Sequence, residues 1–310
     1  MNLESSTQHE TASRAQPMPP AEIPAARRLY WLLRRELWEI RSIYVAPLGV
    51  AGLIVLASLI GAFHLPERMR DAALHGLAKQ HETIVQPYLF AGLVLMGVTF
   101  VISIFYSLDA LQSERRDRSI LFWKSMPVSD LATVLVKASV PLVILPLLTV
   151  VLALVTQVIM LGVHSATLAA SGGSAAILWE HVSLPEMSLM LLYHMVAVHS
   201  LSYAPLYAWL LLVSAWARRV PWLWAILPPF AIGIVERIAF GTSTFANLVL
   251  KRMGGGAEGT EYTAASAMMD PLMQMTPGRF LSSPGLWCGL AVTAVFLAIA
   301  VRLRRRHGPV

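Results

Sequence analysis

Residues 109–130 read DALQSERRDRSILFWKSMPVSD, and they form a charged, amphipathic insert between two long apolar runs. Each flanking run contains about 20 mostly apolar residues, which is the length that an α-helix needs to cross a bilayer. The insert carries four basic side chains, at Arg115, Arg116, Arg118 and Lys124. Because an excess of Lys and Arg marks the cytoplasmic ends of membrane spans, we expect the insert to face the cytoplasm. An amphipathic segment in that position is suited to the docking of a cytosolic protein.

The composition of the whole chain also indicates a membrane protein. Hydrophobic residues make up 56% of the chain and charged residues only 14%, against about 25% charged in a typical soluble domain. The net charge is +6, but the basic residues gather in short blocks at the ends of apolar runs, so no nucleic-acid partner is expected. The single cysteine, Cys288, excludes an intramolecular disulfide and a zinc site built from cysteines.

Two segments precede the first apolar run. Residues 1–24 are rich in Ser, Thr, Pro and Ala without apolar periodicity, which predicts a disordered cytoplasmic tail. Residues 25–42 repeat apolar side chains at steps of three and four, which predicts an amphipathic helix. With Tyr30, Trp31 and Trp38 suited to the level of the lipid headgroups, we interpret it as a helix in the cytoplasmic interface. The alternative is a soluble helix packed on a domain.

Residues 43–302 are predicted to form an all-α, polytopic transmembrane domain with six spans, near 43–63, 87–108, 131–162, 188–215, 221–241 and 285–302. Basic blocks at the ends of these spans place both termini in the cytoplasm, including a basic tail at 303–310. Pro141 and Pro146 predict a kink in the third span. Residues 242–284 are expected to form an outer loop with short helices, partly re-entrant. We expect the protein to lie in the bacterial inner membrane.

The order of residues in the insert carries a resemblance to a known family. An acidic and basic cluster, Glu114, Arg115, Arg116 and Asp117, is followed by Arg118 and Ser119, by the apolar Ile120, Leu121 and Phe122, by Pro127, Val128 and Ser129, and then by Lys137. This order resembles the cytosolic signature of type-2 ATP-binding cassette (ABC-2) transporter permeases. The amino-terminal helix, the six spans and the long outer stretch extend the resemblance over nearly the whole chain. Arg118 departs from the glycine that the family often has there.

The resemblance implies that the insert is a coupling helix, which enters a cleft of a separate cytosolic ATPase in an assembly of two permeases and two ATPases. The residues that it assigns to this contact are Glu114, Arg115, Arg116, Asp117, Arg118, Phe122, Trp123 and Pro127. The residue types agree, because Phe122 and Trp123 offer an apolar anchor with charges around it. The alternative is an ordinary solvated loop that is basic only because of topology.

No chemistry of its own is predicted for the chain. It lacks the Gly-x-x-x-x-Gly-Lys-Ser/Thr loop that cradles phosphates, so ATP and Mg²⁺ are expected in the partner ATPase and no cofactor here. His81 and Glu82 begin like a metalloprotease helix, but the second histidine is missing, and no metal site is predicted. The spans contain no paired carboxylates and no nucleophile with a base, which argues against an intramembrane enzyme.

The fourth span is unusually polar for a helix in lipid. It carries His194, His199, Tyr203 and Tyr207, and Glu236 lies near the outer end of the fifth span. Polar groups in a bilayer usually face protein or water, so these residues are candidates for a translocation path. The alternative for the fourth span is hydrogen bonding between helices. Glu236 has its own alternative, which is to stabilise a bend between the span and a re-entrant segment.

These observations lead to two functional hypotheses. In the first, the chain is the permease subunit of an ATP-driven exporter. It works with a second copy of itself or a related permease, and movement is transmitted through residues 109–130 and the amino-terminal helix. In the second, the chain is a membrane-anchored assembly or regulatory component that binds an ATPase without translocating a substrate.

Overall fold

A computed structural model describes residues 24–116, 129–253 and 277–306, and every regular element in them is helical. The predicted all-α class is therefore confirmed for this part of the chain. In chain order the elements are α1 (Ala25–Glu39), α2 (Ser42–Ala62), α3 (Leu65–Leu74), α4 (Leu77–Asp109), α5 (Gln112–Arg116), α7 (Asp130–Ser139), the π-helix η1 (Val140–Ile144), α8 (Leu145–Ala170), α9 (Ala176–His181), α10 (Leu184–His194), the π-helix η2 (Met195–Ser202), α11 (Ala204–Trp216), α12 (Pro221–Phe240), α13 (Thr244–Met253), α15 (Pro277–Ser282) and α16 (Pro284–Arg306).

Five helical stretches are long and apolar enough to cross a bilayer. They are Ser42–Ala62, Leu77–Arg116, Asp130–Ala170, Pro221–Phe240 and Pro284–Arg306. A sixth candidate combines Ala176–Ser202 with Ala204–Trp216, which meet at a bend of 48°. Length and composition thus make this a polytopic membrane protein. Each of these stretches overlaps one of the six predicted spans.

Four of the candidate stretches are longer than predicted, and the second and the last show why. Hydropathy placed the second span at 87–108, but the helix already begins at Leu77. Its extra turns are polar and are held by local contacts, such as the ion pair of 3.1 Å between Lys79 and Glu82. Hydropathy detects only the apolar part of such a helix. At the other end of the chain, α16 continues to Arg306, so residues 303–306 belong to this helix and not to a separate tail.

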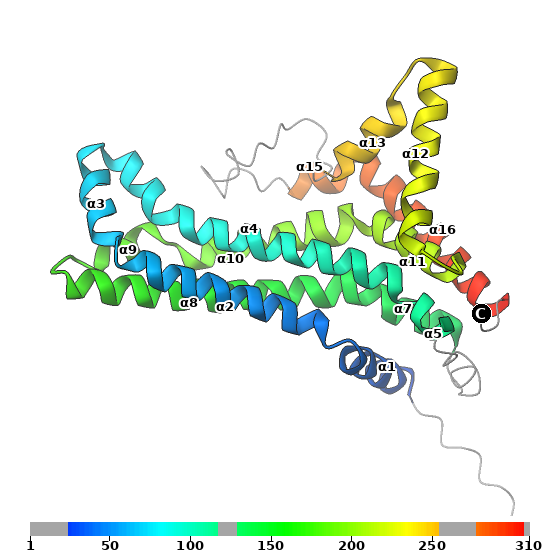
Figure 1. The fold of residues 1–310 in the computed structure, drawn as a ribbon, viewed down its shortest axis with the longest axis horizontal. Coiled ribbons are helices and arrows are strands. Elements are labelled where there is room, and N and C mark those ends of the chain that lie inside the picture. The colour runs from blue at the N-terminus through cyan, green and yellow to red at the C-terminus, as the bar shows by residue number, and fades with distance from the viewer. Residues whose placement is uncertain (1–23, 117–128, 254–276, 307–310) are drawn as a thin grey trace, which may run out of the picture.

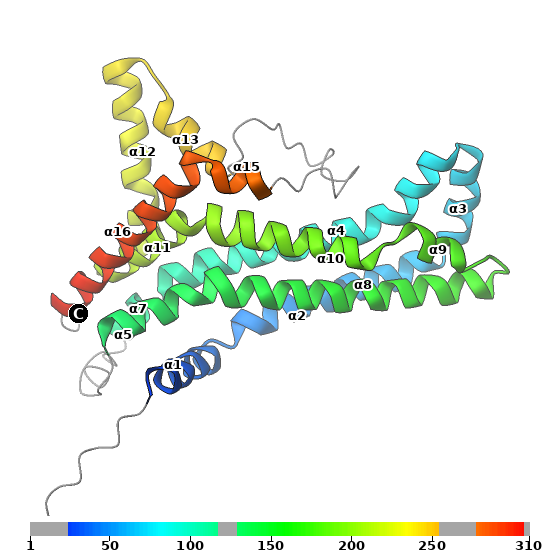
Figure 2. The same cartoon turned by 180° about the vertical axis from the view of Figure 1, so that it is seen from behind.

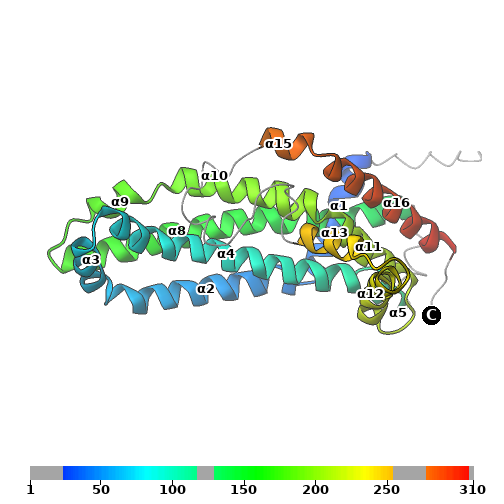
Figure 3. The same ribbon diagram turned by 90° about the horizontal axis from the view of Figure 1, so that it is seen from above.

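The helices α2, α4, α8 and α10 run side by side along the long axis of the molecule (Figures 1 and 3). At one end, the short helices α3 and α9 close the bundle over an apolar cluster that includes Ile84, Tyr88 and Leu161. At the opposite end, α1, α5, α7 and the last turns of α16 gather (Figure 1). The bundle therefore has two chemically different ends, and the charged insert begins and ends at the second.

Prolines shape two of the helices through π-helical turns. Pro141 has no N–H to donate, and its ring displaces the carbonyl of the preceding turn, so the ordinary hydrogen-bond pattern cannot continue. The chain responds with η1, in which the bonds span five residues, and resumes as α8. The predicted effect of Pro141 is thus taken up by a π-helix inside one continuous stretch, Asp130–Ala170. A second π-helix, η2, precedes Pro205 at the bend of the sixth candidate span.

The hairpin of α12 and α13 leaves the bundle and returns to it (Figures 1 and 2). Most of α12 is exposed, and Ala225 is its one buried residue. The return is fixed by Arg252 on α13, whose Nε donates to the carbonyl of Ser202 at 2.9 Å and whose Nη1 donates to that of Gly285 at 3.0 Å. This guanidinium lies directly against Gly289 on α16. One side chain thus joins the hairpin of α12 and α13 to the end of η2 and the start of α16.

The contact between Arg252 and Gly289 predicts the effect of a single methyl group. A Cβ at residue 289 would overlap the guanidinium, which is the end of a flexible side chain, so Gly289→Ala should shift Arg252 and weaken its two hydrogen bonds, at a cost of about 1 kcal/mol. The measurement is the thermal unfolding of the protein in detergent. Gly97→Ala in α4 is the control, because a Cβ there meets no atom within 4 Å and alanine favours the helix. Equal unfolding temperatures for the two variants would contradict this packing.

Candidate functional site

Five ionisable side chains meet at the end of the bundle where the charged insert begins and ends. We call this group the ion network, and its members are Glu36 on α1, Glu114 on α5, Asp130 and Lys137 on α7, and Arg304 on α16. Asp130 is half-buried, while the other four side chains are at most 6% exposed. Segments that are up to 268 positions apart in the chain (304 − 36) are joined in this way.

The charges of the ion network alternate in sign along a continuous chain of contacts. Lys137 Nζ lies 2.8 Å from Glu36 Oε1 and 3.2 Å from Glu114 Oε1. Arg304 donates from Nη1 to Glu114 Oε2 and from Nε to Asp130 Oδ1, the latter at 3.0 Å. Tyr106 on α4 also donates its hydroxyl to Glu36 Oε1, at 2.8 Å. The order is therefore Glu36, Lys137, Glu114, Arg304 and Asp130.

The ion network specifies geometry more than it adds stability. Removing a carboxylate or a cation from water costs several kcal/mol per ion, and the attraction between partners only roughly offsets that cost. The cost becomes severe when one partner is missing, because a buried charge is then left without compensation. A packing in which α1, α5, α7 or α16 is displaced would break at least one of these pairs, and the network selects against it.

The first turn of the insert is fastened to the end of α11 as well. Ser214 Oγ accepts hydrogen bonds from the backbone N–H groups of Leu111 and Gln112, both at 3.0 Å, and so satisfies donors at the start of α5. Arg115 donates to the carbonyl oxygens of Ala215 and Ala217, which end α11. The base of the insert is thus held on two sides, by the ion network and by α11.

These contacts change the interpretation of two predicted docking residues. We expected Glu114 and Arg115 to surround an apolar anchor as surface charges, but both are 4% exposed and bound within the chain. The structure therefore corrects their placement, while Arg116 is exposed as expected. The remaining predicted contact residues, Asp117, Arg118, Phe122, Trp123 and Pro127, lie outside the described residues.

Sequence reasoning missed Glu36, Asp130 and Arg304 as members of one site, and it noted Lys137 only as part of the family motif. A signal was present, because Lys137 lies inside a predicted span, where an unpaired charge is costly. Such a residue implies a buried partner of opposite charge. The sequence could not identify that partner, since Glu36 and Glu114 are 101 and 23 positions away (137 − 36 and 137 − 114).

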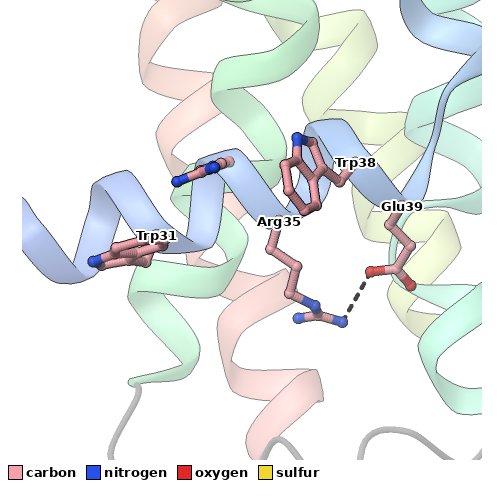
Figure 4. A pocket seen from close by; sticks show the side chains of 5 residues that line it. Trp31, Arg35, Trp38 and Glu39 are labelled. Carbon is pink, nitrogen blue, oxygen red and sulfur yellow. Dashed lines mark ion pairs between the residues drawn. The ribbon is translucent and has the colours of Figure 1, made fainter.

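Helix α1 presents two different faces. On its inner side, Leu33, Leu37 and the following Ile40 pack against an apolar cluster that includes Tyr106 and Ala138. The same side brings Glu36 to the ion network. Its outer face is lined by Trp31, Arg34, Arg35, Trp38 and Glu39 (Figure 4). There the guanidinium of Arg34 lies 5.2 Å from the ring centre of Trp31 and 4.9 Å from that of Trp38, and Arg35 pairs with Glu39 at 2.9 Å. An exposed aromatic and cationic face thus adjoins the base of the insert.

The polar residues of the fourth predicted span are only partly brought together. His199 and Tyr207 are buried, and His199 Nε2 lies 3.3 Å from both Ser103 Oγ and the hydroxyl of Tyr207. Tyr203 is half-buried and packs on Phe100 with ring centres 5.0 Å apart. His194 is separate from this group and bonds the carbonyl of Met190. For His199 and Tyr207, these contacts are the hydrogen bonds between helices that the alternative interpretation describes.

The polar interior continues along α4 and α8, where hydropathy indicated only apolar spans. Thr99 and Thr149 share a hydrogen bond, and Gln157 donates to the carbonyl of Tyr88 at 3.2 Å. Further out, His164 contacts the hydroxyl of Tyr88 at 2.8 Å and that of Ser58 at 3.0 Å. The bundle interior is therefore joined by side-chain hydrogen bonds from η2 to the end that α3 and α9 close.

Glu236 caps a helix. Its carboxylate accepts hydrogen bonds from the hydroxyl of Thr242 at 2.8 Å and from the N–H groups of Thr244 and Phe245 at 2.7 and 2.8 Å. Negative charge is favourable at these free donors at the start of α13. The contacts are those of a residue that stabilises the bend between α12 and α13.

No cluster of three or more potential metal ligands occurs within the described ranges.

Comparisons with known proteins identify no relative. No protein-family model, curated protein or solved structure matches this chain. The functional argument therefore rests on the residues and their geometry.

The position of Lys137 between two carboxylates predicts a large effect of its removal. Lys137→Ala leaves Glu36 and Glu114 buried without the cation between them, so we expect a loss of about 3–5 kcal/mol. Lys79→Ala breaks an exposed pair with Glu82 and should cost less than about 1 kcal/mol. The measurement is unfolding by heat or denaturant in detergent. Similar losses for both lysines would contradict the buried network.

Proposed function

We propose that this chain is the membrane-spanning permease subunit of an ATP-driven transporter of the ABC-2 class, working as an exporter. In this proposal a separate cytosolic ATPase, present in two copies, hydrolyses ATP. Residues 109–130 receive its movement, and a second copy of this chain or a related permease completes the translocation path. The observation that supports the proposal best is the ion network, which anchors both ends of the charged insert to the membrane helices.

The anchoring supports a coupling role because it prevents the two ends of the insert from moving independently of the helices that they join. Glu114 lies in α5, in the first half of the insert, and Asp130 is both the last residue of the insert and the first residue of α7. The insert therefore connects α4, a helix of 33 residues, with the continuous stretch Asp130–Ala170. At about 1.5 Å per residue these helices exceed the thickness of the bilayer core. A displacement of the insert would be passed to both helices along their length.

Helix α1 supports the same proposal as a second contact. Trp and Arg are the residue types that most often dominate protein interfaces, and the outer face of α1 combines Trp31, Arg34 and Trp38. The inner face is tied through Glu36 to the same ion network that holds the insert. Movement of a partner bound at the insert or at α1 would thus reach one rigid base.

One observation favours the alternative of an assembly or regulatory component. His199 and Tyr207 were candidates for the translocation path, but both are enclosed by the helices of a single protomer. In the transporter proposal the path must then lie along other surfaces, such as the seam with the second permease. Substrate-stimulated ATP hydrolysis by the reconstituted complex separates the two functions, because a scaffold should show none.

The transporter proposal requires one orientation in the membrane. We propose that α1, α5 and the end of α16 face the cytoplasm of the bacterial inner membrane, with α3 and α9 on the outer side. In a Cys288→Ser background, the exposed positions Arg116→Cys and Ala170→Cys should react with an impermeant maleimide from opposite sides of sealed vesicles. The expected labelling is Ala170→Cys in right-side-out vesicles and Arg116→Cys in inverted ones. Labelling of both from the same side would contradict the orientation.

The coupling role predicts a specific loss of partner binding. Phe122→Ala combined with Trp123→Ala should release the ATPase during purification, because truncation of aromatic anchors commonly costs about 2 kcal/mol or more, or roughly a 30-fold loss of affinity. The measurement is the ratio of ATPase to permease after affinity purification. Trp179→Ala is the control, since Trp179 is an exposed tryptophan on α9 at the opposite end of the bundle. Wild-type stoichiometry and normal transport in the double variant would show that the insert is not the docking element.

A further inference from the structure

Helix α5 and the amino end of α7 share one cation. Arg304 reaches Glu114 on α5 through Nη1 and Asp130 on α7 through Nε. These two acidic residues are 16 positions apart in the chain (130 − 114), and they bracket residues 117–128. The two ends of the insert are therefore bridged by a side chain that belongs to neither of them.

Arg304 differs from the other arginines around it. The block RLRRR at residues 302–306 places basic side chains on several faces of the last turns of α16. Arg302, Arg305 and Arg306 are exposed, as expected for residues that set membrane topology. Arg304 alone in this block is buried, at 6% exposure, and it points toward α5 and α7. Four arginines of one basic block thus have two different environments, and only Arg304 contacts α5 and α7.

The chemistry of arginine fits this role better than that of lysine. The guanidinium is planar, stays charged at all relevant pH values and holds its N–H donors in fixed directions. Two acceptors on different helices can therefore be held at one fixed spacing. A lysine ammonium is a point charge on a flexible stem and does not impose such a spacing.

We propose that Arg304 is a positioning residue that sets the distance between α5 and the start of α7, and thereby the spacing of the two ends of the insert. Lys137 extends the same arrangement to α1, because it contacts Glu114 as well as Glu36. The consequence for transport rests on the proposed function: with a loose base, ATP hydrolysis in the partner would be transmitted poorly to the spans. The positioning itself requires no partner.

The direct test is a distance measurement on the full-length chain in lipid nanodiscs. Spin labels are attached to Arg116→Cys and Leu131→Cys in a Cys288→Ser background, because both positions are exposed and lie on the two sides of the base. With Arg304 present we expect one narrow distance distribution. Arg304→Gln should broaden it, whereas Arg305→Gln should leave it unchanged, since Arg305 is exposed on the same helical turn.

A second variant keeps the test decisive if Arg304→Gln fails to fold. Asp130→Asn removes one of the two anchors at a half-buried site and leaves the pair between Arg304 and Glu114 intact. It should also broaden the distribution, with little change in unfolding temperature. A narrow distribution in both Asp130→Asn and Arg304→Gln would overturn the proposal. A narrow distribution in Asp130→Asn alone, with Arg304→Gln unfolded, would overturn it as well.

A separate readout distinguishes this inference from the proposed function. In the complex with the ATPase, Arg304→Lys should retain the partner and its ATP hydrolysis but lower the amount of substrate moved per ATP. If the distance distribution broadens as expected while no variant of the complex shows substrate-dependent hydrolysis, then the positioning role stands and the transporter proposal fails. If transport per ATP is unchanged although the distribution broadens, the inferred consequence for coupling is wrong.

Discussion

The contact of Lys137 with Glu36 and Glu114 is the constraint on which the arrangement at this end of the molecule depends. A lysine inside an apolar helix must find anions, and here it finds one on α1 and one on α5. Glu114 then requires Arg304, and Arg304 also binds Asp130. Each ion is acceptable in the protein interior only because its neighbour of opposite charge is present. The successive ion pairs therefore fix α1, α5, α7 and α16 relative to one another. Apolar packing alone would tolerate small shifts between them.

The extent to which the sequence predicted the fold follows from the range of each physical effect. Hydropathy is a local property, and it located the candidate spans and the amphipathic α1. It did not show that α4 begins at Leu77, because the first turns of that helix are polar and are stabilised by contacts such as that of Lys79 with Glu82. It also did not show that Pro141 would be accommodated by a π-helix, since the choice among helix types depends on packing around the free carbonyls.

The candidate site was predictable in its location but not in its construction. Basic residues around 109–130 marked the end of the bundle that carries the network, and the motif drew attention to Glu114 and Lys137. Burial of Glu114 and Arg115 could not be inferred, because it depends on partners such as Arg304 and Ala217 that are distant in sequence. His199 shows the same limit, since its polarity suggested a path through the membrane while its contacts with Ser103 and Tyr207 are those of a helix junction.

The late position of Arg304 in the chain has a consequence for biogenesis. Glu114 and Asp130 are synthesised 190 and 174 residues before the arginine that binds them both. During that interval Arg304 is absent, and Lys137, which contacts Glu36 and Glu114 but not Asp130, is the one cation of the ion network already synthesised. The base of the insert can thus close only after α16 has been inserted. Assembly of this end of the molecule would then follow the completion of the membrane bundle, and a partner that recognises the closed base would bind only protomers whose last helix is in place.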